Sequence, residues 1–113
     1  MFIYKIFRAQ EWETLKSNGT TTGAPIDVQD GYIHFSTGKQ VAETCAKYFA
    51  GENGLVLLIL ESDGLGSDLK WEPSRGGDLF PHLYRPLRLP DIFIQKDLPL
   101  GMDGKHIFPE GVL

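Results

Sequence analysis

The sequence predicts an α+β domain with a small, mostly antiparallel sheet and two helices early in the chain. The 113 residues suit one domain, and a hydrophobic fraction of 42% is enough to build one core. Helical spacing of apolar residues appears only in the first half of the chain. After residue 61, glycines, prolines and charges interrupt the apolar residues, which predicts short strands and irregular loops. Residues 1–113 are therefore expected to form a single domain.

The first elements are a strand and a short helix. Residues 2–7 are mostly β-branched or aromatic and are broken only by Lys5, which predicts a strand. Residues 10–17 contain good helix formers and are followed by Asn18 and Gly19, which commonly end a helix. The chain is thus expected to begin in the sheet and to continue into an amphipathic helix.

A polar loop, a short strand and a second helix are expected next. Residues 20–30 are polar and contain Gly and Pro, so we expect a loop there, and residues 32–35 read as a strand. Thr37 and Gln40 have the spacing of a capping box at a helix start. Apolar residues at helical spacing then predict a helix over residues 38–50.

The second half of the chain is expected to contain the central strand and several short ones. Residues 55–60 are an unbroken apolar run, typical of a strand covered on both faces. The best further strand candidates are residues 69–72 and 91–96. Residues 97–113, rich in Pro and Gly, predict an irregular tail laid over the domain.

Composition excludes several classes of protein. A net charge of -4 argues against bulk binding of nucleic acid, although a local basic patch stays open. The single cysteine, Cys45, allows no disulfide and falls on the apolar face of the expected second helix, so we assign it to the core. The N-terminal residues do not read as a signal peptide, and the longest apolar run is far below the roughly 20 residues of a membrane span. We expect a cytoplasmic protein that is not bound to a membrane.

Familiar catalytic motifs are missing from the sequence. His34, His82 and His106 lack metal-ligand spacing and no HExxH occurs, so no metal site is predicted. No GxGxxG, P-loop or nucleophile elbow is found.

The segment GYIHFST is the first candidate for a binding site. It places His34 before Ser36, Thr37 and a helix start, where free backbone N–H groups suit a phosphate or carboxylate. His34 alternates with Ile33 and Phe35, so it faces the opposite side of its strand. The alternative is structural: the hydroxyls only cap the helix, and His34 is a satisfied structural histidine.

The segment WEPSRGGDLFPHLY concentrates polar and aromatic residues around a glycine pair. Trp71 or Tyr84 can stack on a planar ring, Glu72 can accept from ribose hydroxyls or stabilise developing positive charge, and Arg75 can hold a phosphate. The alternative is an ordinary surface ion pair between Glu72 and Arg75, with Trp71 and Phe80 in the core.

These blocks resemble a known bacterial family. The order YKI, W, GAPIDVQDGYIHFSTGKQVAETCAKYFAG, LVLLILE, LKWEPSRGGDLFPHLY and LPLGMDGKHIFPEG resembles the domain-of-unknown-function family numbered 952 over nearly the whole chain. The resemblance implies a fold similar to that of ADP-ribosyltransferases, which bind NAD in a cleft of a split antiparallel sheet. It further implies that His34, Ser36 and Thr37 hold ribose or phosphate and that Glu72 is the late acid of that superfamily. His34 directly precedes the hydroxyls, however, and no clear glutamate ends the last expected strand, which departs from the superfamily pattern.

Two functions are expected to compete. The first is an enzyme, a transferase or glycohydrolase of ADP-ribosyltransferase type, acting on NAD, ADP-ribose or a phosphate-bearing nucleotide. The second is a non-catalytic module that binds a nucleotide-like metabolite or a protein partner through the same residues. The sequence gives no signal for an oligomer. The candidate catalytic residues are Glu72, His34 and His82, and the candidate ligand-binding residues are Ser36, Thr37, Trp71, Arg75 and Tyr84.

Overall fold

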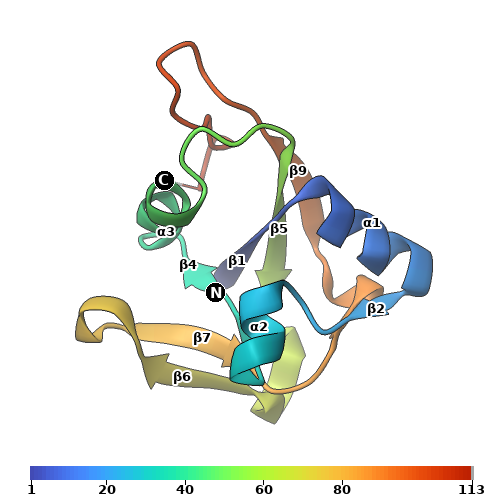
Figure 1. The fold of residues 1–113 in the computed structure, drawn as a ribbon. Coiled ribbons are helices and arrows are strands. Elements are labelled where there is room, and N and C mark those ends of the chain that lie inside the picture. Colours follow the sequence, from blue (N-terminus) through green and yellow to red (C-terminus); the bar gives the residue numbers. More distant parts are fainter. Residues whose placement is uncertain (113) are drawn as a thin grey trace.

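The structure is a computed structural model that describes residues 1–112. The three α-helices lie among strands in the first half of the chain, and the second half contains strands and 3-10 turns (Figure 1). The elements are β1 (Phe2–Phe7), α1 (Ala9–Asn18), β2 (Thr20–Thr21), α2 (Pro25–Asp30), β3 (Ile33–His34), β4 (Ser36–Thr37), α3 (Val41–Tyr48), β5 (Leu55–Glu61), β6 (Leu69–Pro73), β7 (Leu79–Leu83), β8 (Leu87–Arg88) and β9 (Ile94–Leu98), with 3-10 turns at Ser62–Asp68, Arg75–Gly77 and Leu89–Asp91.

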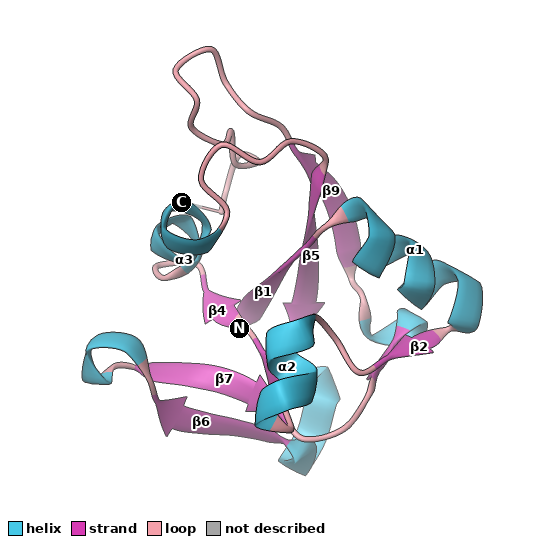
Figure 2. Cartoon of the chain, viewed as in Figure 1, coloured by secondary structure: helices cyan, strands magenta, loops and turns pink. Residues whose placement is uncertain are grey.

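The strands form antiparallel sheets, as expected for an α+β domain. The four-stranded sheet has the order β4-β1-β5-β9, the three-stranded sheet has the order β3-β7-β6, and β2 pairs with β8. Every described strand pair is antiparallel. Figure 2 shows β6 and β7 as a separate hairpin below the larger sheet.

A short extended segment belongs to both larger sheets. Its first part, β3, pairs with β7 through Ile33 and Leu83, and its second part, β4, pairs with β1 through Thr37 and Ile3. Between them the amide of Phe35 donates to the carbonyl of Pro81 at 3.0 Å. The chain therefore passes from one sheet to the other within residues 33–37.

The core lies on both faces of β5, which confirms the expectation for residues 55–60. Val56, Leu58 and Leu60 pack on the face shared with α1 and with β3 and β7. The alternate residues of β5 pack on the other face with Val41 and Cys45 of α3. A strand buried on both faces lacks polar interruption, which is why this run was visible in the sequence.

One expectation about helices was wrong, and another held for the helix but not for its bounds. Residues 20–30 are not only a loop, because they contain α2, a six-residue helix that begins with Pro25 and ends at Gly31. Pro25 has the fixed φ that suits a first helical position, and Gly31 adopts the left-handed conformation of a helix end. The helix expected over residues 38–50 forms but is shorter, Val41–Tyr48, because residues 38–40 form a turn in which the Gln40 amide donates to the carbonyl of Thr37.

The last segment is mostly irregular, as expected. After β9 the described chain forms turns, with one isolated bridge between Leu100 and His106 (Figure 2). Val112 returns to pack against the α3 side of the core. Across residues 1–112, no helix has the length and apolar character needed to cross a membrane.

Candidate functional site

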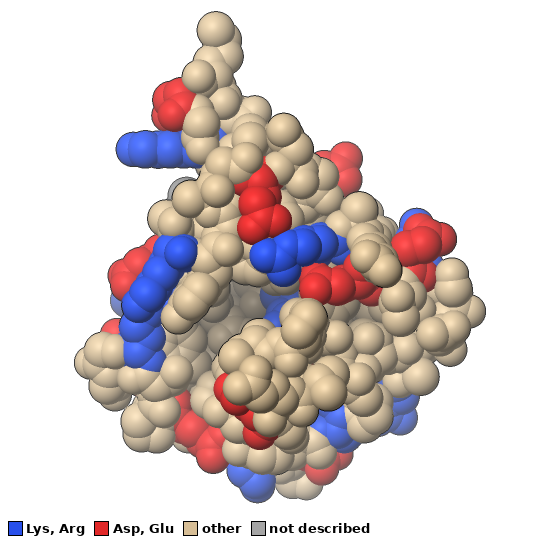
Figure 3. All heavy atoms as spheres, in the orientation of Figure 1, with Lys and Arg blue, Asp and Glu red and all other residues tan. Residues whose placement is uncertain are grey.

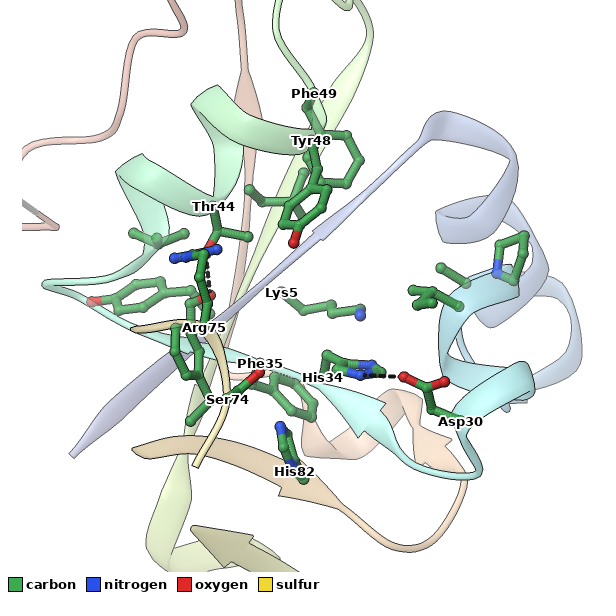
Figure 4. A pocket seen from close by; sticks show the side chains of 18 of the residues that line it. Lys5, Asp30, His34, Phe35, Thr44, Tyr48, Phe49, Ser74, Arg75 and His82 are labelled. Carbon is green, nitrogen blue, oxygen red and sulfur yellow. Dashed lines mark hydrogen bonds and ion pairs between the residues drawn. The ribbon is translucent and has the colours of Figure 1, made fainter. Parts of the chain in front are cut away.

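A cavity of about 580 Å³ opens between α2, α3 and the junction of the two larger sheets. Figure 3 shows a hollow on this face with charged side chains near its rim. In Figure 4, Thr44, Tyr48 and Phe49 stand on the α3 side, His34 and Asp30 on the α2 side, and His82 below. The wall is mixed: apolar side chains such as Val41 and Phe80 share it with polar groups.

Cationic groups outnumber anionic ones among the described residues that line the cavity. Lys5, Arg8 and Arg75 line it, against the single carboxylate of Asp30. The Arg75 guanidinium donates to Thr44 Oγ1 at 3.1 Å and lies 3.2 Å from Glu43 Oε1. Glu43 is 74% exposed, so this ion pair is weak and a ligand anion can compete for Arg75. The chain is acidic as a whole, yet cationic side chains predominate among the charged residues of the cavity lining.

The first carboxylate-histidine pair is buried beneath the cavity. Asp27, which has no exposed side-chain surface, accepts from His34 Nδ1 at 2.6 Å and from the His34 amide at 3.0 Å. The ammonium of Lys5 lies 2.8 Å from the other carboxylate oxygen, which also accepts from the Ala24 amide. Asp30 then faces the second ring nitrogen of His34 at 3.0 Å (Figure 4). Both nitrogens of His34 are thus occupied by carboxylates.

Burial and pairing set the pKa values of this buried group. Burial lowers the pKa of the Lys5 ammonium, against the opposing charge of Asp27. Burial tends to raise the pKa of Asp27, but the hydrogen bond from His34 and the charge of Lys5 lower it further, so the net shift is downward. Asp27 is therefore an anion held by two partners and two backbone amides.

The second carboxylate-histidine pair stands on the β6-β7 hairpin. Glu72 Oε1 accepts from His82 Nδ1 at 2.8 Å and from the Tyr84 hydroxyl at 2.6 Å. The hydrogen bonds from Tyr84 and then His82 lower the pKa of Glu72, and the bond to Glu72 raises the pKa of Tyr84 to about 12. The His82 side chain is only 3% exposed, whereas that of Glu72 is 37% exposed.

An aromatic cluster holds the two histidines together. Strand pairing places His34 directly opposite His82, and their ring centroids are 5.3 Å apart. Tyr32 stacks on His82 at 4.3 Å and also contacts His34 and Tyr84. The imidazoles are therefore fixed by packing as well as by hydrogen bonds.

The structure brings half of the candidate residues into one cavity. Its lining includes His34, Ser36, Arg75 and His82, which come from both sequence segments. The remaining four do not line it: Glu72, Thr37, Trp71 and Tyr84. Glu72 and Tyr84 are connected to the cavity through His82, because Glu72 accepts hydrogen bonds from both His82 and Tyr84.

The anion site expected at a helix start is not formed by Ser36 and Thr37. Both residues belong to β4, and α3 begins only at Val41. The Thr37 amide does donate to the Gln40 side chain at 3.0 Å, which is half of the expected capping box. Ser36 Oγ lies 3.0 Å from Thr44 Oγ1 at the cavity wall, so Ser36 remains a wall residue without a helix terminus behind it.

The expected surface pair of Glu72 and Arg75 does not form. Arg75 turns toward Glu43 and Thr44 of α3, while Glu72 bonds to His82 and Tyr84. Trp71 is 39% exposed and is not a core residue, whereas Phe80 is buried beneath the Arg75 guanidinium. The hairpin turn between β6 and β7 uses Gly76 and Gly77, both with positive φ.

Lys5 and Asp27 were missed as site residues. The sequence signal for Lys5 was present: it is a lone charge between Ile3 and Phe7 on the apolar face of β1. Asp27 carried only the weaker signal of an acid two positions after a proline, the first turn of a helix. Lys5 and Asp27 are 22 positions apart, and no local sequence pattern predicts that they form an ion pair.

Cys45 is a buried core residue, as expected. Its thiol lies 3.3 Å from His106 Nδ1, and His106 Nε2 donates to the carbonyl of Glu52 at 2.7 Å. Burial raises the pKa of Cys45 to about 11, so it is a protonated thiol that donates to the imidazole. Within residues 1–112, no cluster of three or more His, Cys, Asp or Glu side chains could hold a metal ion.

Comparison with known proteins found solved structures that are similar over nearly the whole chain. The crystal structure of protein CC0527 from Caulobacter crescentus is 46% identical, has a TM-score of 0.94, and the match covers 99% of this chain and 98% of that one. Its solution NMR structure matches with 50% identity and a TM-score of 0.83 over 92% of this chain and 90% of that one. A comparison with curated proteins found no match. The family described as "Protein of unknown function (DUF952)" matches residues 6–94, and the chain belongs to this family.

Proposed function

We propose that the cavity binds a phosphate-bearing nucleotide-like ligand and that the chain acts on NAD or ADP-ribose. The observation that carries this proposal is the meeting of His34, Ser36, Arg75 and His82 in one cavity lined by further cations and aromatic rings. The volume of about 580 Å³ falls within the range of small-molecule sites. Neither GYIHFST nor WEPSRGGDLFPHLY forms the cavity wall alone. That residues of both segments line one cavity favours a binding site over two unrelated structural motifs.

Phosphate recognition is assigned to Arg75 with help from Arg8. Both guanidiniums are held over aromatic rings, Arg75 over Phe80 at 5.1 Å and Arg8 over Phe49 at 4.8 Å. Arg8 also pairs with Glu52, at 2.9 Å, near the rim. A fixed guanidinium can give two parallel hydrogen bonds to a phosphate, which fits anion binding in an otherwise acidic chain.

Kinship with the ADP-ribosyltransferase fold is part of the proposal. It is supported by two antiparallel sheets that are joined through β3 and β4 and border the cavity. In the superfamily pattern of an early-strand histidine, a hydroxyl and a late glutamate, the corresponding residues are His34, Ser36 and Glu72. Glu72 then acts from behind His82 instead of touching the ligand itself.

Ligand binding is tested by thermal unfolding in the presence of NAD, ADP-ribose, AMP, adenosine and nicotinamide. We expect the phosphate-bearing compounds to raise Tm as their concentration rises, and the two uncharged compounds to raise it less. Arg75→Gln should abolish the difference, while Arg88→Gln, on β8 and outside the cavity lining, is the matched control. Equal shifts for adenosine and AMP would contradict phosphate recognition.

Turnover is tested by nicotinamide release from NAD. If the chain is a glycohydrolase or transferase, His82→Ala should reduce kcat about 10²- to 10⁴-fold, the usual contribution of a positioned acid or base. Wild-type protein that binds NAD without releasing nicotinamide would contradict turnover and leave only the second candidate function, a binding module.

The second candidate is a binding module without turnover. It is favoured by the state of the carboxylates near the cavity: Asp27, Asp30 and Glu72 are each engaged by a histidine. A carboxylate that already holds an imidazole is less able to stabilise positive charge on a sugar carbon. Stabilisation by ADP-ribose combined with no nicotinamide release is the result expected of such a module.

A further inference from the structure

The three histidines differ in how many ring nitrogens are already occupied. His34 faces a carboxylate with each nitrogen, and His106 contacts Cys45 with one nitrogen and the carbonyl of Glu52 with the other. His82 contacts Glu72 through Nδ1, and no polar atom of residues 1–112 is bonded to its Nε2. His82 is therefore the histidine of the described chain with an unused ring nitrogen.

That nitrogen is open to the cavity although the residue is almost fully buried. The His82 side chain is 3% exposed and lines the cavity, and Figure 4 shows its ring standing toward it. Within the described part of the chain, every side-chain nitrogen or oxygen fully shielded from solvent has a hydrogen-bond partner. The unbonded Nε2 consequently retains its small accessible surface, and that surface faces the cavity.

The tautomer of His82 follows from its partner. An ionised carboxylate can only accept hydrogen bonds, and Glu72 accepts both from Tyr84 and from His82. Nδ1 therefore carries the proton in the neutral ring, which leaves the lone pair on Nε2. This arrangement of a carboxylate behind an imidazole resembles the way hydrolytic triads orient a general base.

We propose that Nε2 of His82 is the proton acceptor of the cavity and binds a hydroxyl group of the ligand, with Glu72 and Tyr84 as positioning residues. This inference rests on the proposed function, which supplies a ligand with sugar hydroxyls. In turnover, the O–H bond of that hydroxyl breaks and an N–H bond forms at Nε2, so the proton moves to the imidazole and the resulting imidazolium lies beside the Glu72 carboxylate. The structure thus gives Glu72 a role through His82 and gives His34 a role in holding Asp27.

Reaction with diethyl pyrocarbonate tests the unused nitrogen directly. The reagent acylates the unprotonated, unbonded nitrogen of an imidazole, and peptide mass spectrometry identifies the modified residue. Exposure alone predicts that His34, at 27%, reacts before His82, at 3%. We expect the opposite order by about tenfold or more, because reaction at His34 requires breaking a charge-assisted hydrogen bond. Faster modification of His34 in the folded protein would overturn the assignment.

Nitrogen NMR of labelled protein tests the positioning role of Glu72. We expect the spectrum of His82 to show a protonated Nδ1 and an unprotonated Nε2, and Glu72→Ala to shift the population toward the opposite tautomer. Glu13→Ala, on the far exposed face of α1, is the matched control and should leave the His82 signals unchanged. A protonated Nε2 in the neutral wild-type ring would overturn the inference.

The ligand contact is tested with ADP-ribose as the probe. ADP-ribose at saturating concentration should slow acylation of His82 at least about tenfold, because the hydroxyl then occupies the lone pair. Unchanged acylation alongside a raised Tm would overturn the contact and leave cavity binding intact. Failure of ADP-ribose to raise Tm would overturn the proposed function, while the order of modification and the tautomer still decide the role of Nε2.

Discussion

The two carboxylate-histidine pairs use the same chemistry in opposite surroundings. Asp27 and His34 are joined beneath the cavity with a buried lysine, whereas Glu72 and His82 are joined on a hairpin whose carboxylate is partly exposed. In the first pair the carboxylate is sealed and both ring nitrogens are engaged. In the second the carboxylate meets water and one ring nitrogen stays open. A histidine beside a cavity is therefore available to a ligand only where its protein partners leave one ring nitrogen without a hydrogen bond.

Removing Asp27 should have the largest effect on stability. Asp27→Ala leaves the ammonium of Lys5 buried without a counter-charge, which we expect to cost about 3–5 kcal/mol of unfolding free energy. Urea unfolding measures the loss. Asp27→Ala combined with Lys5→Met should recover part of it, because no unpaired charge remains buried. A decrease of less than about 1 kcal/mol in the unfolding free energy of Asp27→Ala would show that the buried pair of Asp27 and Lys5 does not stabilise the fold.

The same carboxylate should make stability fall in acid. The pKa of Asp27 is lower in the folded protein than in the unfolded chain, where an aspartate titrates at about 4. Its contribution is therefore complete above that pH and is lost as the pH falls through the lower folded pKa. Urea midpoints of the wild type and of Asp27→Asn should converge below about pH 4. Curves that stay equally far apart in acid would contradict this.

A side chain placed against the buried Asp27 carboxylate should lower the unfolding free energy slightly less than removal of Asp27 does. Gly23 has a φ of +98°, and a Cβ there would overlap the Asp27 carboxylate. We expect Gly23→Ala to lower the unfolding free energy by about 3 kcal/mol, from backbone strain and overlap together. Gly31→Ala is the control, since its φ of +85° carries strain but its Cβ meets open space, and about 1 kcal/mol is expected. Equal losses would show that contact with Asp27 is unimportant.

Replacing each histidine should separate stability from binding. We expect His34→Ala to destabilise by about 1–3 kcal/mol, because buried Asp27 loses the imidazole donor and keeps only the backbone amide at position 34. His82→Ala should destabilise less, because Glu72 can turn to water, but should reduce the Tm increase given by ADP-ribose, because one hydrogen bond to the ligand is lost. Thermal unfolding with and without ADP-ribose measures both. If His82→Ala does not fold while His34→Ala does, the open pair is the structural one.

The smallest effect is expected at Tyr84 in alkali. Glu72 raises the pKa of this phenol to about 12, whereas a tyrosine in the unfolded chain titrates near about 10. The folded state then holds a proton that the unfolded state loses, so stability falls as the pH rises above the unfolded value. Near-ultraviolet absorbance should show one tyrosine that ionises at a higher pH than the others, and in Glu72→Gln this tyrosine should ionise at a lower pH. Identical titration curves would contradict the Tyr84 to Glu72 hydrogen bond.

Much of the fold followed from local pattern. The strand of residues 55–60 was predictable because burial on both faces leaves an unbroken apolar run, and Cys45 was placed in the core by helical spacing. The helix α2 was not predicted, because six residues that include Pro25 and Asp30 resemble a polar loop. Its first turn depends on Asp27 accepting from the Ala24 amide, a contact made while that carboxylate is held by Lys5.

The candidate site was predictable in composition but not in arrangement. The two polar segments indicated His34 and His82, and only strand pairing shows that they are opposite each other. Whether a side chain faces the cavity depends on tertiary placement: Arg75, in the turn between β6 and β7, lines it, whereas Trp71, on β6, does not. The partners of each imidazole are tertiary contacts, so the unused nitrogen of His82 had no local signal.

The extended segment from Ile33 to Thr37 also governs how the chain folds. Its hydrogen bonds reach forward to Leu83 and back to Ile3, so each end closes a long loop before either sheet is complete. Such distant pairings carry a large entropic cost and form late in folding. Because one five-residue segment contributes to both sheets, the sheets should unfold as one cooperative unit. The amides of Phe35 and its neighbours are then expected to exchange with solvent only through global unfolding.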